Sequence, residues 1–201
     1  MSLQYADPDV SRTKFDREIA EYRQLAEQYR RRGCFLVRAE FPAVLVVLAT
    51  AMTKPAVLVM GVAFDYSNYD AAPPSVRIVN PFSGEPYKLK DIPSQLPRLI
   101  PQQQVAVPGL PPGGRLMLEV AQPYMQAHDA EEVPFLCLAG VREYHEHPAH
   151  SGDLWELHRK SGAGRLVRLL EVIDRYGVAP IVGFNVQLVP QVALNYGPPQ
   201  A

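Results

Sequence analysis

Cysteine is scarce in this sequence, where Cys34 and Cys137 are the two thiols among 201 residues. Two cysteines cannot build the disulfide framework of a small secreted domain, so we expect a protein of the reducing cytoplasm. Long apolar runs are lacking too. The longest, Phe41 to Met52, lies close to a lysine and a proline and is too short to cross a membrane. The polar first ten residues do not have the pattern of a signal peptide.

An excess of charge of either sign is also missing. The chain has 20 Lys+Arg and 21 Asp+Glu, for a formal net charge of −1. This balance removes the electrostatic case for binding nucleic acid or a membrane surface. Hydrophobic residues make up 47% of the chain, as in an ordinary globular protein, so the chain is not disordered as a whole. Its length suits one domain.

Two stretches have the apolar spacing of helices. Residues Thr13 to Arg32 carry an apolar residue every three or four positions, begin at a capping threonine and stop at Gly33. Residues Arg165 to Tyr176 repeat this pattern and stop at Gly177.

Between the two predicted helices, four β-rich runs are separated by proline-containing turns that are too short for crossover helices. They are Cys34–Val37, Ala43–Leu48, Val57–Phe64 and Ser75–Val79. The sequence therefore predicts an antiparallel meander within an α+β domain.

The domain organisation follows from composition. We expect an N-terminal arm over residues 1–12, the main domain over 13–179 and an extended C-terminal tail over 180–201. Within the main domain, residues 91–114 are rich in proline and glycine and are predicted to form an irregular insertion. A short strand is expected to follow, over Leu116 to Val120.

The chemistry is concentrated in one place, because all five histidines and Cys137 fall between His128 and His158. Thiolate and imidazole are ligands that Zn²⁺ prefers, and four of them close a tetrahedral structural site. The candidate zinc ligands are Cys137, Glu143, His145, His147, His150 and His158. Cys137 with three histidines would make a closed site, whereas Cys137 with two histidines and Glu143 or water would leave an open position.

Cys137 has a second possible role as a nucleophile, which a neighbouring histidine or a helix N-terminus would activate by lowering the pKa of the thiol. Metal coordination and nucleophilic attack exclude each other, because a bound metal occupies the thiolate. The zinc deaminase signature is absent, since no second cysteine follows Cys137. The metalloprotease helix is absent as well, because His147 comes too early after His145 and Pro148 interrupts.

The order of elements and several short motifs resemble the ubiquitin-conjugating (UBC-like) family. The stretch Phe64 to Ile78, with its tyrosines and Pro73-Pro74, is similar to that family's strand–tyrosine–Pro-Pro–strand signature. Cys137-Leu138 is similar to the cysteine-leucine pair that carries the thioester, and Trp155 to a downstream tryptophan of the family.

One departure matters. Conjugating enzymes have His-Pro-Asn about ten residues before the cysteine, whereas this chain has His128-Asp129-Ala130 and lacks the asparagine. A bacterial UBC-like group that is predicted to bind metal through Cys, Glu and two His, and that is found with ubiquitin-like modification genes, resembles the chain more closely.

The resemblance therefore implies three alternative functions. The first is a metal-binding accessory protein of a bacterial ubiquitin-like modification pathway, with zinc held by Cys137 and histidines. The second is an active conjugating enzyme that carries the modifier as a thioester on Cys137. The third is a metal-free interaction module. A ubiquitin-like protein and its activating enzyme are the implied partners.

Overall fold

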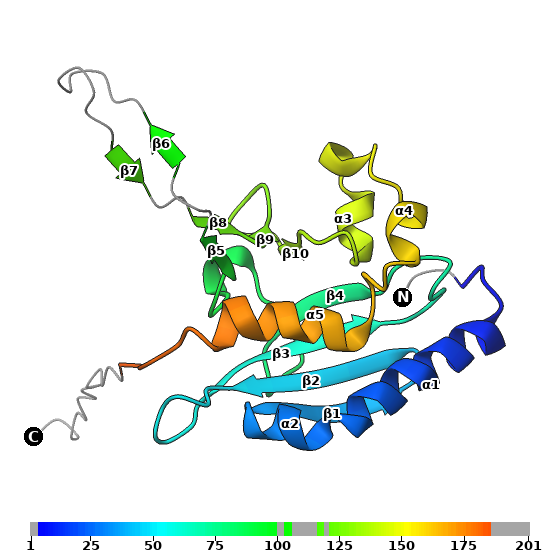
Figure 1. The fold of residues 1–201 in the computed structure, drawn as a ribbon, viewed down its shortest axis with the longest axis horizontal. Coiled ribbons are helices and arrows are strands. Elements are labelled where there is room, and N and C mark those ends of the chain that lie inside the picture. Colours follow the sequence, from blue (N-terminus) through cyan, green and yellow to red (C-terminus); the bar gives the residue numbers. More distant parts are fainter. Residues whose placement is uncertain (1–3, 100–102, 106–115, 119–120, 186–201) are drawn as a thin grey trace, which may run out of the picture.

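The computed structural model describes residues 4–99, 103–105, 116–118 and 121–185 (Figure 1). Its α-helices are α1 Pro8–Gln24, α2 Ala26–Arg31, α3 Arg142–Glu146, α4 Trp155–Arg159 and α5 Leu166–Ile173. Its strands are β1 Cys34–Glu40, β2 Ala43–Ala49, β3 Leu58–Asp65, β4 Ser75–Val79, β5 Pro97–Leu99, β6 Gln103–Val105, β7 Leu116–Leu118, β8 Ala121–Pro123, β9 Met125–Gln126 and β10 Phe135–Leu136. Two 3-10 turns, η1 Leu89–Asp91 and η2 Pro148–His150, and a π-helical segment, η3 Asp174–Val178, complete the elements.

The centre of the molecule is a four-stranded antiparallel sheet in the order β1-β2-β3-β4, as the β-rich runs predicted. Alternate residues of the strands point to the same face of a sheet. On one face these residues are buried and apolar, with Val46, Val62 and Ile78 at 2% exposure or less. Helices α1, α2 and α5 lie over one side of this sheet (Figure 1). The α+β layout expected from the sequence is confirmed.

Helices α1 and α5 supply the apolar residues opposite the sheet. From α1 these are Phe15, Ile19 and Tyr22, three or four positions apart and at most 4% exposed. From α5 they include Leu169 and Leu170, at most 1% exposed. Burial of each large side chain stabilises the fold by roughly 1.5–3 kcal/mol.

The predicted start of the first helix was wrong. The helix begins at Pro8, because the side chain of Asp7 caps it by accepting from the backbone N–H of Asp9 at 2.9 Å, and proline suits a first helical position. The Thr13 hydroxyl donates to the Asp9 carbonyl within the helix instead of capping it. The predicted single helix is also divided in two, at Leu25.

The predicted end of the second helix at Gly177 was wrong as well. The chain continues past α5 as the π-helical segment η3, which includes Gly177. A β-carbon added at Gly177 would lie 3.1 Å from a side-chain carbon of Leu96. Glycine is therefore used here for close packing and not as a stop signal.

The proline-rich insertion was predicted to be irregular. Residues 92–96 have no helix or strand, but the prediction was wrong over Pro97–Leu99 and Gln103–Val105, which form short strands. Strand β5 pairs with β8, and β6 with β7, in a hairpin arm that projects from the body (Figure 1). The predicted strand after the insertion is confirmed over Leu116–Leu118. The stretches 100–102 and 106–114 of the insertion lie outside the described residues.

The predicted C-terminal tail has no helix or strand over residues 181–185, and residues 186–201 lie outside the described part of the chain. No helix among the described residues has the length and apolarity needed to cross a membrane.

A buried carboxylate fixes α5 against α1. The side chain of Glu18, on α1, is 6% exposed. It accepts from the backbone N–H of Leu166 at 2.9 Å and from the Tyr69 hydroxyl at 3.2 Å. The first N–H groups of a helix have no partner within the helix, so Glu18 supplies one at the start of α5. Burial raises the pKa of Glu18, and the two hydrogen bonds oppose that rise.

We predict that Glu18→Ala lowers the free energy of unfolding by roughly 2–4 kcal/mol, because it leaves two buried donors without an acceptor. Glu21→Ala is the matched control, since Glu21 lies on the same helix and pairs with the exposed Arg165. Urea unfolding of both variants is the measurement. Equal losses for the two variants would contradict the role given to Glu18.

The raised pKa of Glu18 also predicts a pH dependence. A folded-state pKa above the unfolded value means that the stabilising contribution is fully present below the unfolded pKa and is lost as the pH rises through the folded pKa. Glu18→Gln does not titrate. The stability of the wild type relative to Glu18→Gln should therefore fall as the pH rises above the ordinary glutamate pKa of about 4.3. Urea unfolding across this pH range would show a constant difference if the prediction is wrong.

Candidate functional site

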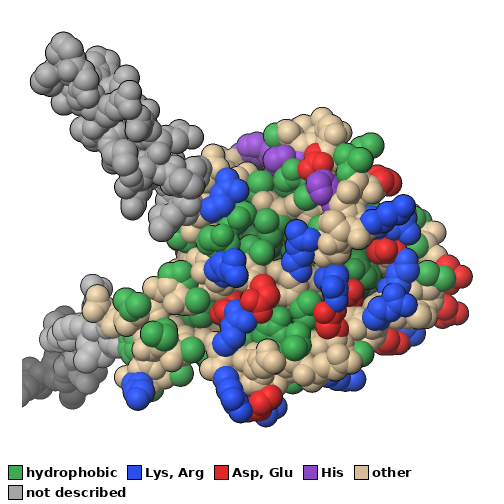
Figure 2. Space-filling model, in the orientation of Figure 1, with side chains coloured by type: hydrophobic (Ala, Val, Ile, Leu, Met, Phe, Trp, Pro, Cys, Tyr) green, Lys and Arg blue, Asp and Glu red, His purple; other side chains and the backbone are tan. Residues whose placement is uncertain are grey.

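The segment that carries Cys137 and most of the histidines lies between the four-stranded sheet and α5 in the sequence. Backbone hydrogen bonds hold it at Cys137 and at Arg142. Cys137 directly follows β10 and its N–H donates to the Tyr124 carbonyl at 2.8 Å. Arg142 begins α3 and its N–H donates to the Pro74 carbonyl at 2.9 Å. Figure 2 shows histidine side chains gathered at one edge of the molecule.

Cys137 and His150 form a close pair, with 3.6 Å between Sγ and Nε2. Cys137 is partly exposed, whereas Cys34 is buried, and both are free thiols. The ring of Tyr144 stacks on His150 with centroids 3.9 Å apart and fixes its plane. Burial raises the pKa of the Cys137 thiol, and the charge of Arg98 opposes that rise.

A second pair joins His147 and His128, whose Nε2 atoms are 3.2 Å apart. The ring of His147 also stacks on Phe135, with centroids 4.8 Å apart. The backbone N–H of Ala149 donates to His147 Nδ1 at 3.3 Å, so His147 Nε2 carries the proton and donates to His128. The His147 and His150 rings are 5.7 Å apart, so the two pairs are neighbours.

His128 was not among the predicted ligands. It reaches His147 because β9 pairs with β10 and the loop between them turns back toward η2. The one signal in the sequence was its place as the first of five clustered histidines.

Glu143, which was a predicted ligand, lies elsewhere. It is 9% exposed and its carboxylate accepts from the Ser75 hydroxyl and from the Val76 N–H at 3.3 Å. The Glu143 carboxylate also forms an ion pair with the Arg77 guanidinium, with 3.2 Å between nitrogen and oxygen. Glu143 thus ties α3 to strand β4.

His145 and His158, also predicted ligands, are gathered around Asp153. His145 Nδ1 lies 2.7 Å from the Asp153 carbonyl, and its Nε2 lies 2.7 Å from the Ala139 carbonyl. A neutral imidazole can donate to one of these carbonyls, whereas a doubly protonated ring donates to both. His158 Nε2 is 2.5 Å from one carboxylate oxygen of Asp153, and the Tyr144 hydroxyl donates to the other at 2.7 Å.

These contacts shift two pKa values. The hydrogen bonds from His158 and then Tyr144 lower the pKa of Asp153. Burial, followed by the bond to Asp153, raises the pKa of Tyr144 to about 12. Asp153 therefore stays ionised and Tyr144 stays protonated near neutral pH, which keeps the Tyr144 ring in place beside His150.

No three His, Cys, Asp or Glu side chains in the described part of the chain are close enough together, as they stand, to hold a metal ion. Of the six predicted ligands, the structure brings Cys137 and His150 together. It places His147 beside them with His128, and it engages Glu143, His145 and His158 in other contacts.

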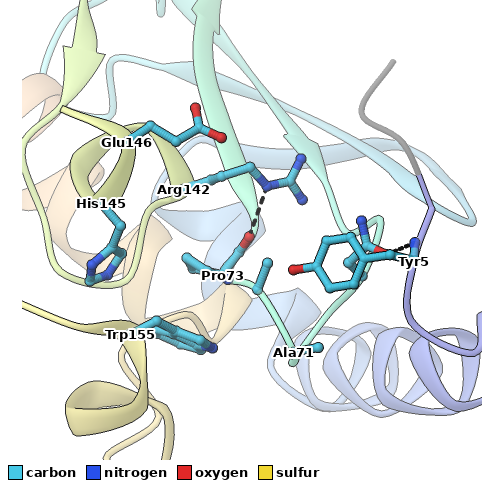
Figure 3. A pocket seen from close by; sticks show the side chains of 9 residues that line it. Tyr5, Ala71, Pro73, Arg142, His145, Glu146 and Trp155 are labelled. Carbon is cyan, nitrogen blue, oxygen red and sulfur yellow. Dashed lines mark hydrogen bonds between the residues drawn. The ribbon is translucent and has the colours of Figure 1, made fainter.

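A separate hollow of about 440 Å³ lies on the side of α3 that carries Arg142 and His145 (Figure 3). Two of its polar side chains are hydrogen-bonded to the protein backbone. Arg142 donates to the Pro73 carbonyl at 3.2 Å, and the Trp155 indole donates to the Asp70 carbonyl at 2.9 Å. These bonds fix the wall of the hollow and leave its lining largely apolar.

Comparison with known proteins gives two matches. A family model described as Y4jH-like, of the Y4jH family, matches residues 6–181. The uncharacterized protein y4jH of Sinorhizobium fredii (strain NBRC 101917 / NGR234) is 44% identical over 206 residues, a match that covers 99% of this chain and 97% of that relative.

We predict that Glu143→Ala lowers the free energy of unfolding by roughly 1–3 kcal/mol, because the buried Val76 N–H loses its acceptor. Glu146→Ala, at an exposed position of the same helix, is the control and should change stability by less than about 0.5 kcal/mol. Thermal unfolding measures both. A Glu143→Ala protein as stable as the control would show that the carboxylate does not tie α3 to the sheet.

Proposed function

This chain belongs to the Y4jH-like family, and we propose that it is a metal-binding, UBC-like component of a bacterial ubiquitin-like modification pathway. A zinc ion is the proposed metal, and its ligands are Cys137, His150, His147 and His128. A ubiquitin-like protein and its activating enzyme are the proposed partners, in the cytoplasm.

The observation that carries the metal proposal is the spacing of the two donor pairs. With Zn–N bonds of about 2.05 Å and a Zn–S bond of about 2.3 Å, tetrahedral ligands lie about 3.3 Å apart for two nitrogens and about 3.6 Å apart for sulfur and nitrogen. The measured separations are 3.2 Å for the His128–His147 pair and 3.6 Å for the Cys137–His150 pair. Each pair thus has the spacing of one edge of a zinc tetrahedron.

A four-ligand site requires the two pairs to move together, and the His147 and His150 rings lie 5.7 Å apart. To bind through Nε2, His147 would carry its proton on Nδ1 and give up the hydrogen bond from the Ala149 N–H. Binding would be weaker at low pH, because protons compete with the metal for the imidazole nitrogens and the thiolate. The ion would then supply a fixed positive charge that holds Cys137 as a thiolate and links the β9–β10 loop to η2.

The UBC-like part of the proposal rests on the layout. The helix, the four-stranded meander, the cysteine after the sheet and the C-terminal helix come in the order that the resemblance implied. Both cysteines are free thiols, which agrees with a reducing compartment.

The conjugating-enzyme alternative has less support. Burial raises the pKa of the Cys137 thiol, which reduces the thiolate fraction that a nucleophile needs. Ala130 stands where the family's asparagine would be, and its carbonyl accepts from the Lys90 N–H. The accessory role is therefore preferred over the thioester carrier. It is preferred over a metal-free module because of the donor spacing.

We predict that the purified protein, never exposed to chelator, contains about one equivalent of zinc. Cys137→Ser and His128→Asn should each lower the zinc content and the melting temperature, because structural metal binding is coupled to folding. Elemental analysis and thermal unfolding are the measurements.

The matched controls are His158→Asn and Glu143→Gln, which should keep full zinc because both side chains are engaged elsewhere. Protein without any transition metal would refute the metal site. Loss of zinc in His158→Asn, with full zinc in His128→Asn, would show that His158 and not His128 is a zinc ligand. A thiol-sensitive adduct on Cys137, formed with a ubiquitin-like protein, its activating enzyme and ATP, would favour the enzyme alternative.

A further inference from the structure

A small hollow is lined by Cys137 and by residues of the β5–β8 pair at the base of the hairpin arm. Its volume is about 70 Å³. It is lined by Arg98, Gln122, Pro123, Tyr124, Gln126 and Cys137. It is much smaller than the hollow beside Arg142 and His145 and has room for a small functional group.

Arg98 is held in place at the wall of this hollow. It lies opposite Gln122 in the β5–β8 pairing, and its guanidinium donates to the Gln122 side-chain oxygen at 2.7 Å. The same guanidinium lies over the Tyr124 ring, 5.4 Å from the centroid. A guanidinium has five N–H donors in a planar fork, so further donors remain after the bond to Gln122.

The chemistry of the lining selects the ligand. Arg98 supplies a fixed positive charge and parallel donors, which match a carboxylate. Gln126 and Gln122 supply amide groups at the same wall. His150, whose Nε2 lies 3.6 Å from Sγ, is a second basic group beside the thiol.

We propose that this hollow is a carboxylate subsite, which presents the carboxylate of a small acid to the sulfur of Cys137. Arg98 binds the carboxylate, and the carbon next to it lies against Sγ. This site goes beyond the metal-binding role. Arg98, which binds the anion, is not a proposed zinc ligand, whereas the sulfur of Cys137 is, so the sulfur is open to the small acid when it carries no metal.

The test compares two alkylating reagents of nearly equal size, iodoacetate and iodoacetamide, on the full-length protein after treatment with a chelator. In both reactions the sulfur forms a bond to the CH₂ carbon while the C–I bond breaks and iodide leaves. The thiolate fraction affects both rates in the same way, and removal of metal leaves no bound cation to attract iodoacetate. The ratio of the two rates at Cys137 therefore reports the effect of the reagent's carboxylate. Mass spectrometry of the Cys137 peptide separates it from Cys34, which is 2% exposed.

We expect the iodoacetate-to-iodoacetamide ratio at Cys137 to exceed that of free cysteine by roughly five- to tenfold, through the local positive charge. Arg98→Gln should return the ratio to that of free cysteine, whereas Arg98→Lys, which keeps the charge, should retain part of the preference. Arg30→Gln, at the exposed end of α2, is the control and should leave the ratio unchanged.

Two outcomes would overturn the subsite. One is a wild-type ratio equal to that of free cysteine. The other is an elevated ratio that survives in Arg98→Gln, which would assign the anion preference to His150. Absence of zinc from the protein as purified, together with an elevated, Arg98-dependent ratio, would refute the metal proposal and leave the subsite standing.

Discussion

The buried carboxylate of Glu18 is the interaction on which the arrangement of this protein depends. It joins α1 to the first N–H of α5 and to Tyr69 in the turn between β3 and β4. With these contacts, α5 is fixed across the sheet and closes the core with Leu169 and Leu170. The segment that bears Cys137 runs between β4 and α5, so this carboxylate fixes the point at which the segment ends.

A second carboxylate, Glu143, fixes the middle of the same segment to β4. Between these two anchors lie four of the five histidines. In that interval Asp153 collects His145, His158 and Tyr144. This network is structural, and it explains why only some of the clustered histidines remain beside the thiol.

The sheet and the approximate positions of the helices could be predicted, because β-branched runs and apolar periodicity depend on local sequence. The helix ends could not. Thr13 has the sequence of a cap but lies inside α1, since Asp7 and Pro8 form a better start, and Gly177 is required by its contact with Leu96. The ligand candidates could be listed but not sorted, because a histidine's partner is decided by tertiary contacts. Glu143 was a candidate ligand but is bound to β4, and His128 was not a candidate but lies against His147.

The β5–β8 pair at the base of the hairpin arm determines how far the length of the arm can vary. Arg98 and Gln122 face each other in one antiparallel pair, and the residues between them leave from and return to that pair. The geometry beside Cys137 is therefore set by the register at the base, not by the number of residues beyond it. Relatives with longer or shorter arms would keep the same surroundings of the sulfur, and a foreign domain could be inserted between β6 and β7 without displacing Arg98.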